Sequence, residues 1–162
     1  EGLKIRVTPD KVRLATFELL GAQPAPLSFG ELYSALQQGV FDAQENPLSI
    51  IDSASFFEVQ KYVSMTGHIW GAACLTVSSV TWAQISPEDQ AAVKEAAVKW
   101  GNAQRQMIAD SETALVEKLK SKGMQFNDVD KAAFIEALQP IWESQKDVFG
   151  PELLAVMDRY RK

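Results

Sequence analysis

The chain has 162 residues, of which 46% are hydrophobic and 23% are charged. This balance is typical of a globular protein with one domain or two small lobes, whose core needs no disulfide. A formal net charge of −5 argues against nucleic acid as a partner, because phosphate binding requires clustered lysine and arginine. No run of 18 apolar residues occurs in the sequence, which predicts no membrane-spanning helix.

The first third of the sequence alternates short strands with helices. Residues 3–7 alternate apolar and basic side chains, which indicates a strand. Asp10 is suited to cap a helix that ends at Gly21. The prolines of residues 23–27 favour a short strand at a sheet edge, because proline has no N–H to donate to a neighbouring strand.

Two further strand–helix boundaries follow. Ser28 and Glu31 have the spacing of a capping box, which predicts a helix over residues 31–38. Residues 40–45 are predicted to form a third strand, and Pro47 suits the first turn of the next helix. This alternation predicts a parallel sheet in an α/β fold, in which ligands bind beyond the carboxyl ends of the strands.

The middle of the chain is predicted to hold two strands and one long helix. The strands are expected at residues 62–65 and 68–77. Ser86 is the expected cap of a helix that runs to about Lys122 and spans about 54 Å at about 1.5 Å per residue. Because this length exceeds the width of a small lobe, we expect the helix to cross two lobes, with a kink near Gly101.

The C-terminal part is predicted to hold a short strand at residues 124–126 and helices at residues 131–149 and 152–160. Pro140 is expected to kink or interrupt the first of these helices. These elements divide the chain into three parts. They are an α/β ligand-binding lobe (1–68), a crossing strand with the long helix and a short strand (69–127), and C-terminal helices (128–162).

Arg6 is the strongest single candidate for a ligand-binding residue. It lies near the carboxyl end of the first predicted strand, on the face opposite Ile5 and Val7. Its guanidinium can hold a carboxylate through two parallel hydrogen bonds. On the strand pattern alone, an arginine that faces solvent and pairs with a surface acid is the more common outcome.

The stretch from Gln44 to Asn46 has two interpretations that local pattern does not separate. Asn46 precedes Pro47, where it can cap the next helix or donate its amide to a carboxylate near the helix start. Glu45 can accept a ligand hydroxyl or face solvent, and the role of Gln44 is equally open.

Two aromatic residues are candidates for a pocket wall, with ordinary core packing as the alternative. Phe29 stands at a helix start after a short strand, and Trp70 stands at the start of the predicted strand 68–77. The single histidine, His68, is expected to be structural, because zinc needs three or four ligands. The single cysteine, Cys74, is expected to be a small buried apolar residue.

Signals for catalysis are absent from the sequence. It has no HExxH, GxSxG, CxxC or phosphate-loop motif. We therefore predict that the protein is not an enzyme and that it has no catalytic residue, metal or cofactor.

Four stretches of the sequence carry a resemblance to a known family. LKIRV, ELYSALQQGVFDAQENPLSII, EVQKYVSMTGHIW and TVSSVTW closely resemble the solute-binding proteins of TRAP transporters, the DctP family. The run ELYxALQQGxxDxQENP is close to a family signature. The resemblance covers essentially the whole chain and corresponds to roughly the C-terminal half of a member. It implies a periplasmic-binding-protein-like α/β lobe with short, mostly parallel strands, a crossing strand, a long lobe-spanning helix and C-terminal helices, with the N-terminal lobe largely missing.

The resemblance also implies a function and a set of site residues. Members are periplasmic proteins that capture an organic acid through its carboxylate and deliver it to a membrane permease. Arg6 and Asn46 match the residues that contact the carboxylate. Phe29 matches an aromatic residue that often lines the cleft, and Trp70 lies in a segment that contacts ligand in some members. The loop that contains Asp10 varies with the ligand, so the resemblance implies no contact there.

A half-cleft should bind its ligand weakly and should leave apolar surface exposed. The resemblance places the opposite cleft wall outside these residues, so water would reach an arginine–carboxylate pair and weaken it. Apolar surface without its neighbouring lobe could be covered by a partner chain or by self-association. The alternative function is therefore a truncated interaction module that docks a partner chain or the permease without binding ligand tightly.

Overall fold

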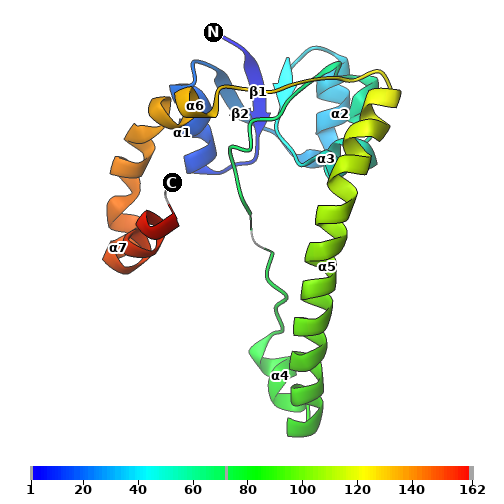
Figure 1. Ribbon diagram of the computed structural model, residues 1–162, viewed down its shortest axis with the longest axis vertical. Helices are drawn as coiled ribbons and strands as arrows, with labels where there is room; N and C mark the ends of the chain where they lie inside the picture. Colours follow the sequence, from blue (N-terminus) through cyan, green and yellow to red (C-terminus); the bar gives the residue numbers. More distant parts are fainter. Residues whose placement is uncertain (1, 72, 161–162) are drawn as a thin grey trace. The chain divides into compact units, whose positions relative to one another are not determined.

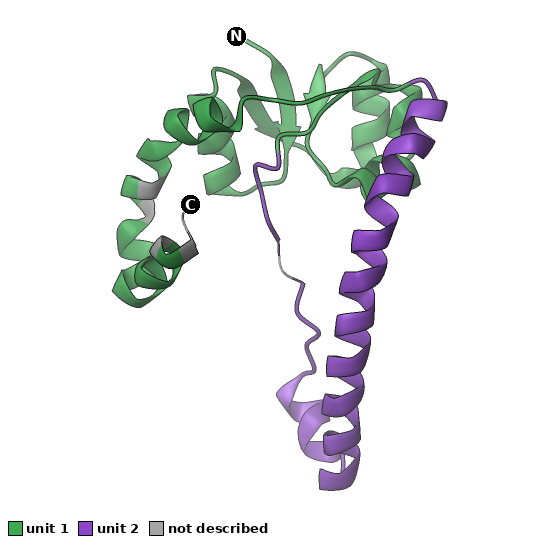
Figure 2. Ribbon diagram, in the orientation of Figure 1, with its two compact units in different colours: residues 1–66, 124–162 green, residues 67–123 purple. Residues whose placement is uncertain are grey.

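A computed structural model of the chain describes residues 2–71 and 73–160 (Figure 1). The chain divides into two compact units, which Figure 2 distinguishes by colour. Unit 1 comprises residues 1–66 and 124–162, and unit 2 comprises residues 67–123.

Unit 1 is built around a parallel sheet of three strands in the order β2-β1-β3, as the alternation of strands and helices predicts. Arg6 of the central strand pairs in register with Ala25 on one side and with Gln44 on the other. The carboxyl ends of the strands therefore bring Arg6 and Gln44 to one edge of the sheet. The strands are β1 (Lys4–Val7), β2 (Gln23–Pro26) and β3 (Ala43–Gln44).

The central strand is buried more completely than its sequence indicates. Ile5, Arg6 and Val7 are all buried, although alternating apolar and basic residues suggest one covered face and one exposed face. The prediction of a proline-containing edge strand is confirmed, because β2 pairs only with β1 in the described sheet.

Strand β3 is shorter than the predicted strand over residues 40–45. The Asp42 side chain provides the reason, because its Oδ2 accepts the backbone N–H of Lys4 at 3.0 Å, in place of a carbonyl oxygen. The backbone N–H of Asp42 donates to the Lys4 carbonyl at 2.9 Å, so the pairing of residues begins only at Ala43.

Helices α1 (Lys11–Leu19) and α2 (Phe29–Gln37) follow β1 and β2. Asp10 caps α1 as predicted, since its carboxylate accepts the N–H of Arg13 at 2.8 Å. The capping-box prediction for α2 is wrong. The helix begins earlier, at Phe29, and the side chain of Ser28 makes no capping hydrogen bond. The apolar stripe of α2, with Leu32 and Leu36 one turn apart, is buried.

The remaining elements of unit 1 include a second parallel pair, β4 with β5, where the sequence predicts two strands. Helix α7 contacts α1 and α6, and Gly150 interrupts its helical backbone at a φ of 69°. Helix α6 ends before Pro140, which confirms a break there. These elements are α3 (Leu48–Ser53), η1 (Phe56–Glu58), β4 (Tyr62–Ser64), β5 (Gln125–Asn127), α6 (Lys131–Ala137) and α7 (Gln139–Tyr160).

Unit 2 contains the predicted long helix, α5 (Pro87–Ser121), capped by Ser86. The helix passes through Gly101 without any non-helical residue, so the expected kink is not found. A single glycine lowers helix propensity by about 1 kcal/mol, but its N–H still bonds to the preceding turn, unlike that of proline.

The predicted crossing strand over residues 68–77 is wrong as secondary structure. Its described residues form no strand, because no other described strand lies beside them to exchange backbone hydrogen bonds. Cys74 in this segment is exposed, which also corrects the expectation that it is buried.

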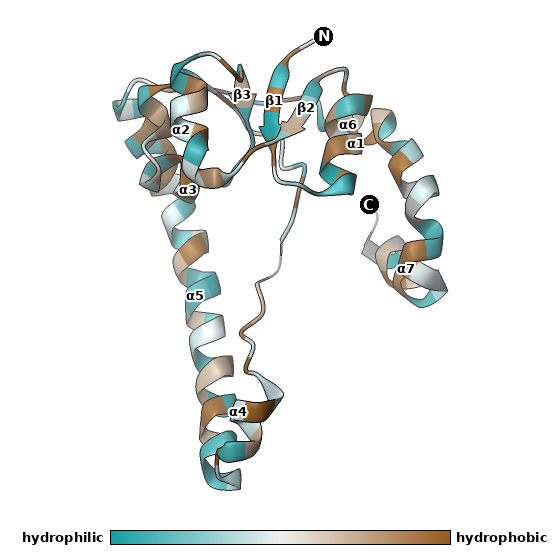
Figure 3. Cartoon of the chain, turned by 180° about the vertical axis from the view of Figure 1, so that it is seen from behind, coloured by the Kyte–Doolittle hydropathy of each residue, from teal (hydrophilic) through white to brown (hydrophobic). Residues whose placement is uncertain are grey.

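A short helix, α4 (Ser79–Gln84), precedes α5 and was not expected from the sequence. Ser78 caps it by accepting the N–H of Thr81 at 3.1 Å. The amide of Gln90 on α5 donates to the carbonyls of Trp82 and Ile85 at 2.8 and 3.1 Å, which joins the two helices. Figure 3 shows apolar positions interspersed with polar ones along α5.

The contrast between the caps of α1 and α2 gives a test of the fold. We expect Asp10→Ala to lower the free energy of unfolding of unit 1 by about 1 kcal/mol, because it removes the acceptor for the Arg13 N–H. Asp10→Asn keeps an acceptor and should cost much less. Ser28→Ala is the matched control, since this position precedes a helix of the same length without a side-chain cap. Urea unfolding followed by circular dichroism measures all three, and equal losses for Asp10→Ala and Ser28→Ala would contradict the assignment.

Candidate functional site at the carboxyl ends of the central strands

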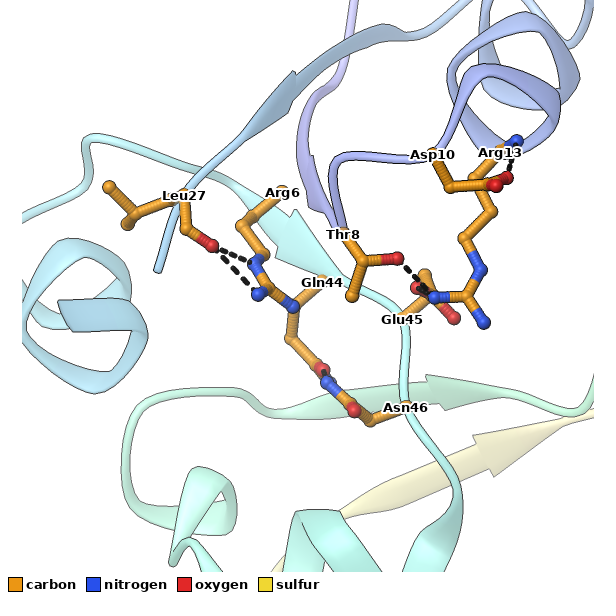
Figure 4. Close-up of polar contacts among 8 residues, drawn as sticks. All are labelled: Arg6, Thr8, Asp10, Arg13, Leu27, Gln44, Glu45 and Asn46. Atoms are coloured by element: carbon orange, nitrogen blue, oxygen red, sulfur yellow. Dashed lines mark hydrogen bonds and ion pairs between the residues drawn. The ribbon is translucent and has the colours of Figure 1, made fainter. Parts of the chain in front are cut away.

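Polar side chains gather where β1 and β3 end (Figure 4). Because the strands are parallel neighbours, Thr8 and Glu45 follow directly from their last residues at the same edge of the sheet. Arg6, Gln44 and Asn46 complete this group, which we call the strand-end cluster together with Arg13 of α1. All six residues lie in unit 1.

Arg6 is held in a fixed orientation by the backbone. Its Nε and Nη2 both donate to the carbonyl oxygen of Leu27, at 2.9 and 2.7 Å. The residue is only 3% exposed, so the interpretation as a solvent-facing arginine is wrong. One carbonyl therefore takes the side edge of the guanidinium. The terminal edge, with one N–H from Nη1 and one from Nη2, makes no hydrogen bond with the described residues.

Burial and neighbouring charges act on Arg6 in different directions. Burial lowers its pKa below the usual value, because removal from water disfavours the charged form. The negative charge of Glu45 raises the pKa, and the positive charge of Arg13 lowers it. An arginine has such a high starting pKa that it stays protonated at neutral pH. The cluster thus holds a buried cation whose neighbours only partly neutralise it.

Arg13 is a cluster residue that the sequence reasoning missed. Its guanidinium Nη1 donates to the Thr8 hydroxyl and lies 3.7 Å from a Glu45 carboxylate oxygen. The side chain of Glu45 is 11% exposed and that of Arg13 is 30% exposed. The signal available in the sequence was a second arginine in the first turn of the helix after β1. That position is as common for a surface arginine as for a site residue.

Asn46 does not cap helix α3. The N-cap position is Pro47, and the amide nitrogen of Asn46 instead donates to Gln44 Oε1 at 2.6 Å. The capping interpretation of Asn46 is therefore wrong. Gln44, whose role was open, fixes the orientation of the Asn46 amide at the strand end.

The two aromatic candidates lie in different units. Phe29 begins α2 two residues after Leu27, and 49% of it is exposed. Its ring meets the buried ring of Phe56 edge-on, with centroids 6.0 Å apart and planes at 61°. Trp70 belongs to unit 2 and is 86% exposed. Among the described residues, no group of three or more histidine, cysteine, aspartate or glutamate side chains is placed to hold a metal ion.

Comparison with known proteins identifies the family of the chain. Residues 1–147 match the family described as bacterial extracellular solute-binding protein, family 7 (DctP). The chain belongs to this family. None of the described helices is long and apolar enough to cross a membrane.

Relatives with names and solved structures support the assignment. The 2,3-diketo-L-gulonate-binding periplasmic protein YiaO of Escherichia coli is 34% identical over 98% of this chain and 49% of its own length. The sialic acid-binding periplasmic protein SiaP of Vibrio cholerae is 37% identical over 96% of this chain and 48% of its own. The chain thus spans about half the length of these curated relatives.

Solved structures of similar proteins have the same fold as this chain. A TRAP periplasmic solute-binding protein of Polaromonas sp. JS666, bound to D-erythronate, superposes with a TM-score of 0.89 at 39% identity, over 96% of this chain and 52% of that one. A protein of Roseobacter denitrificans with bound L-galactonate gives a TM-score of 0.86 at 38% identity, with the same coverage of both chains. These similarities confirm the predicted family and, apart from the crossing strand, the fold that it implies.

The orientation of Arg6 can be tested without a ligand. We expect the Nε–H of Arg6 to exchange with water at least about tenfold more slowly than that of the exposed Arg105, because it is buried and bonded to the Leu27 carbonyl. Nitrogen-15 NMR of the arginine side chains measures both rates. Similar exchange rates for the two residues would contradict the buried hydrogen bond.

Proposed function

We propose that the protein is a periplasmic solute-binding protein of a TRAP transporter, which captures an organic acid through its carboxylate and delivers it to the membrane permease. The observation that carries this proposal is the buried guanidinium of Arg6, whose side edge is fixed by Leu27. Its terminal edge has the spacing that two carboxylate oxygens need.

In the proposed complex, the ligand carboxylate accepts one N–H from each terminal nitrogen of Arg6. The Leu27 carbonyl has already oriented the guanidinium, so little side-chain freedom is lost on binding. The surrounding protein excludes water from most of the arginine, which strengthens the charge–charge attraction relative to an exposed pair. An anion can thus bind at a local positive feature, although the whole chain has a net charge of −5.

Asn46 is proposed as a second donor to the same carboxylate. Its Nδ2 uses one N–H for Gln44 Oε1, and an amide nitrogen carries two. Phe29 is proposed as an apolar wall of the site, since 49% of it is exposed. The assignment of Trp70 to the site stays a prediction from the resemblance.

The relatives support an acid as the ligand class. The structure from Polaromonas holds D-erythronate and that from Roseobacter holds L-galactonate, and each of these ligands carries one carboxylate. Both are TRAP periplasmic solute-binding proteins, which also supports the periplasm and a TRAP system as the setting. A role in catalysis finds no support, because this family consists of solute-binding proteins.

The proposal predicts that binding depends on the ligand carboxylate and on the two parallel N–H donors of the Arg6 guanidinium. We expect D-erythronate to shift the NMR signals of Arg6 and its neighbours, whereas erythritol, which lacks the carboxylate, should not. Arg6→Lys should weaken erythronate binding by about tenfold or more, because an ammonium cannot make two parallel hydrogen bonds. Arg105→Lys on α5 is the control and should bind as the parent does. Equal binding of erythronate and erythritol, or unchanged affinity in Arg6→Lys, would refute the proposal.

A second candidate function, docking of a partner chain, is favoured by exposed apolar residues in unit 2. Trp70, Leu75 and Trp100 are all largely exposed there, and large exposed apolar side chains occur at interaction surfaces. Docking does not require ligand binding. A chain with Arg6 replaced should therefore still dock the permease or another protein.

Self-association offers a measurement of this second function. If the chain associates through unit 2, we expect sedimentation equilibrium to give a mass that rises with concentration. Trp100→Glu should reduce that association, since it places a charge in the apolar contact. Gln104→Glu adds the same charge at an exposed polar position of the same helix and should have little effect. A constant monomer mass up to millimolar concentration would count against this candidate.

A further inference from the structure

We infer that Arg13 and Glu45 together recognise a hydroxyl group of the ligand, so that the site prefers hydroxylated acids over unsubstituted ones. This inference rests on the proposed function, because it assumes that Arg6 binds the carboxylate. It assigns a specificity role to two residues that lie beside the carboxylate site and that the proposed binding of the carboxylate does not use.

The position of the pair supports this role. Thr8 comes two residues after Arg6, and alternate residues of an extended chain lie about 6–7 Å apart on the same side. Arg13 donates to the Thr8 hydroxyl, and Glu45 follows Gln44, which is in register with Arg6. The charges of Arg13 and Glu45 both act on Arg6, so the pair lies within electrostatic range of the carboxylate site. A short hydroxy acid on Arg6 would bring its hydroxyl groups to this pair.

The chemistry of the pair suits a hydroxyl group. A hydroxyl donates one hydrogen bond and accepts others, and the pair supplies both a guanidinium donor and a carboxylate acceptor. Arg13 Nη1 and Glu45 Oε1 are 3.7 Å apart, which is longer than a close hydrogen bond. Both side chains are partly exposed to solvent. Arg13 and Glu45 can therefore exchange part of their mutual attraction for bonds to a ligand hydroxyl.

Thr8 gives the pair a fixed place. Its hydroxyl accepts from Arg13 Nη1, so the guanidinium stays at the loop after β1 instead of extending into solvent. The backbone N–H of Arg13 is also held by the Asp10 cap, which fixes where the side chain starts. Arg13 is thus oriented at both ends before any ligand binds, and this lowers the entropy cost of an additional contact.

The test compares ligands that differ only in their hydroxyl groups. D-Erythronate and butanoate have the same number of carbons and one carboxylate each, and NMR titration of the full chain measures affinities down to the millimolar range. We expect the parent protein to prefer erythronate. Arg13→Met should reduce the ratio of the erythronate affinity to the butanoate affinity by about tenfold, because a charge-assisted bond to a hydroxyl is lost. Loss of the positive charge acts on the carboxylate of both acids and therefore does not change this ratio. Arg13→Lys should restore part of the ratio, and Thr8→Val should give a smaller loss than Arg13→Met.

The outcomes separate this inference from the proposed function. An unchanged ratio in Arg13→Met, or an equal loss for both ligands, would overturn the role of the pair while leaving carboxylate binding at Arg6 intact. Weaker binding of both acids in Arg6→Lys, with the erythronate-to-butanoate ratio lowered most in Arg13→Met, would support both statements. Failure of the parent protein to bind either acid would refute the proposed function and the inference together. Thermal unfolding of each variant checks that the fold is kept.

Discussion

The buried guanidinium of Arg6 is the constraint on which the arrangement of unit 1 depends. A cation taken out of water must be compensated by fixed dipoles or charges, or its burial would oppose folding. The Leu27 carbonyl supplies one such dipole through two hydrogen bonds, and the charge of Glu45 supplies a further attraction. Leu27 joins β2 to α2, and Glu45 follows β3. The Arg6 side chain on β1 therefore interacts with groups at the ends of both neighbouring strands. An incompletely paired cation at that place is a cost to stability that binding of an anion would offset.

The parallel sheet explains why residues far apart in sequence meet at this edge. Adjacent parallel strands point the same way, so the segments that follow β1 and β3 begin at the same edge of the sheet. Thr8 and Arg13 follow β1 and Glu45 follows β3, yet the three residues form one hydrogen-bonded and charged group. The arrangement gives a local excess of positive charge within an acidic protein. Recognition of an acid would then rest on a few oriented donors and would owe little to the overall field.

Local signals predicted most elements and failed where the decisive partner was distant. The Asp10 cap and the start of α5 at Ser86 depend on neighbours within one turn, and both are confirmed. Asn46 is an exception with a nearby partner, because its amide could cap the helix or donate elsewhere, and only the structure shows that it donates to Gln44. The segment 68–77 has the composition of a strand, but a strand also needs a neighbour that pairs with it. Arg13 was missed because nothing in the sequence distinguishes a site arginine from a surface one.

The sequence by itself determined the family, the parallel α/β order of the first lobe, and the choice of Arg6 and Asn46 as site candidates. Motifs and apolar periodicity contain this information, since they reflect contacts over short stretches of chain. Only the tertiary structure decided that Arg6 is buried, that Leu27 occupies one edge of its guanidinium, and that Arg13 pairs with Glu45. These facts depend on long-range pairing across the sheet. The orientation of a side chain is set by atoms that the sequence places tens of residues away.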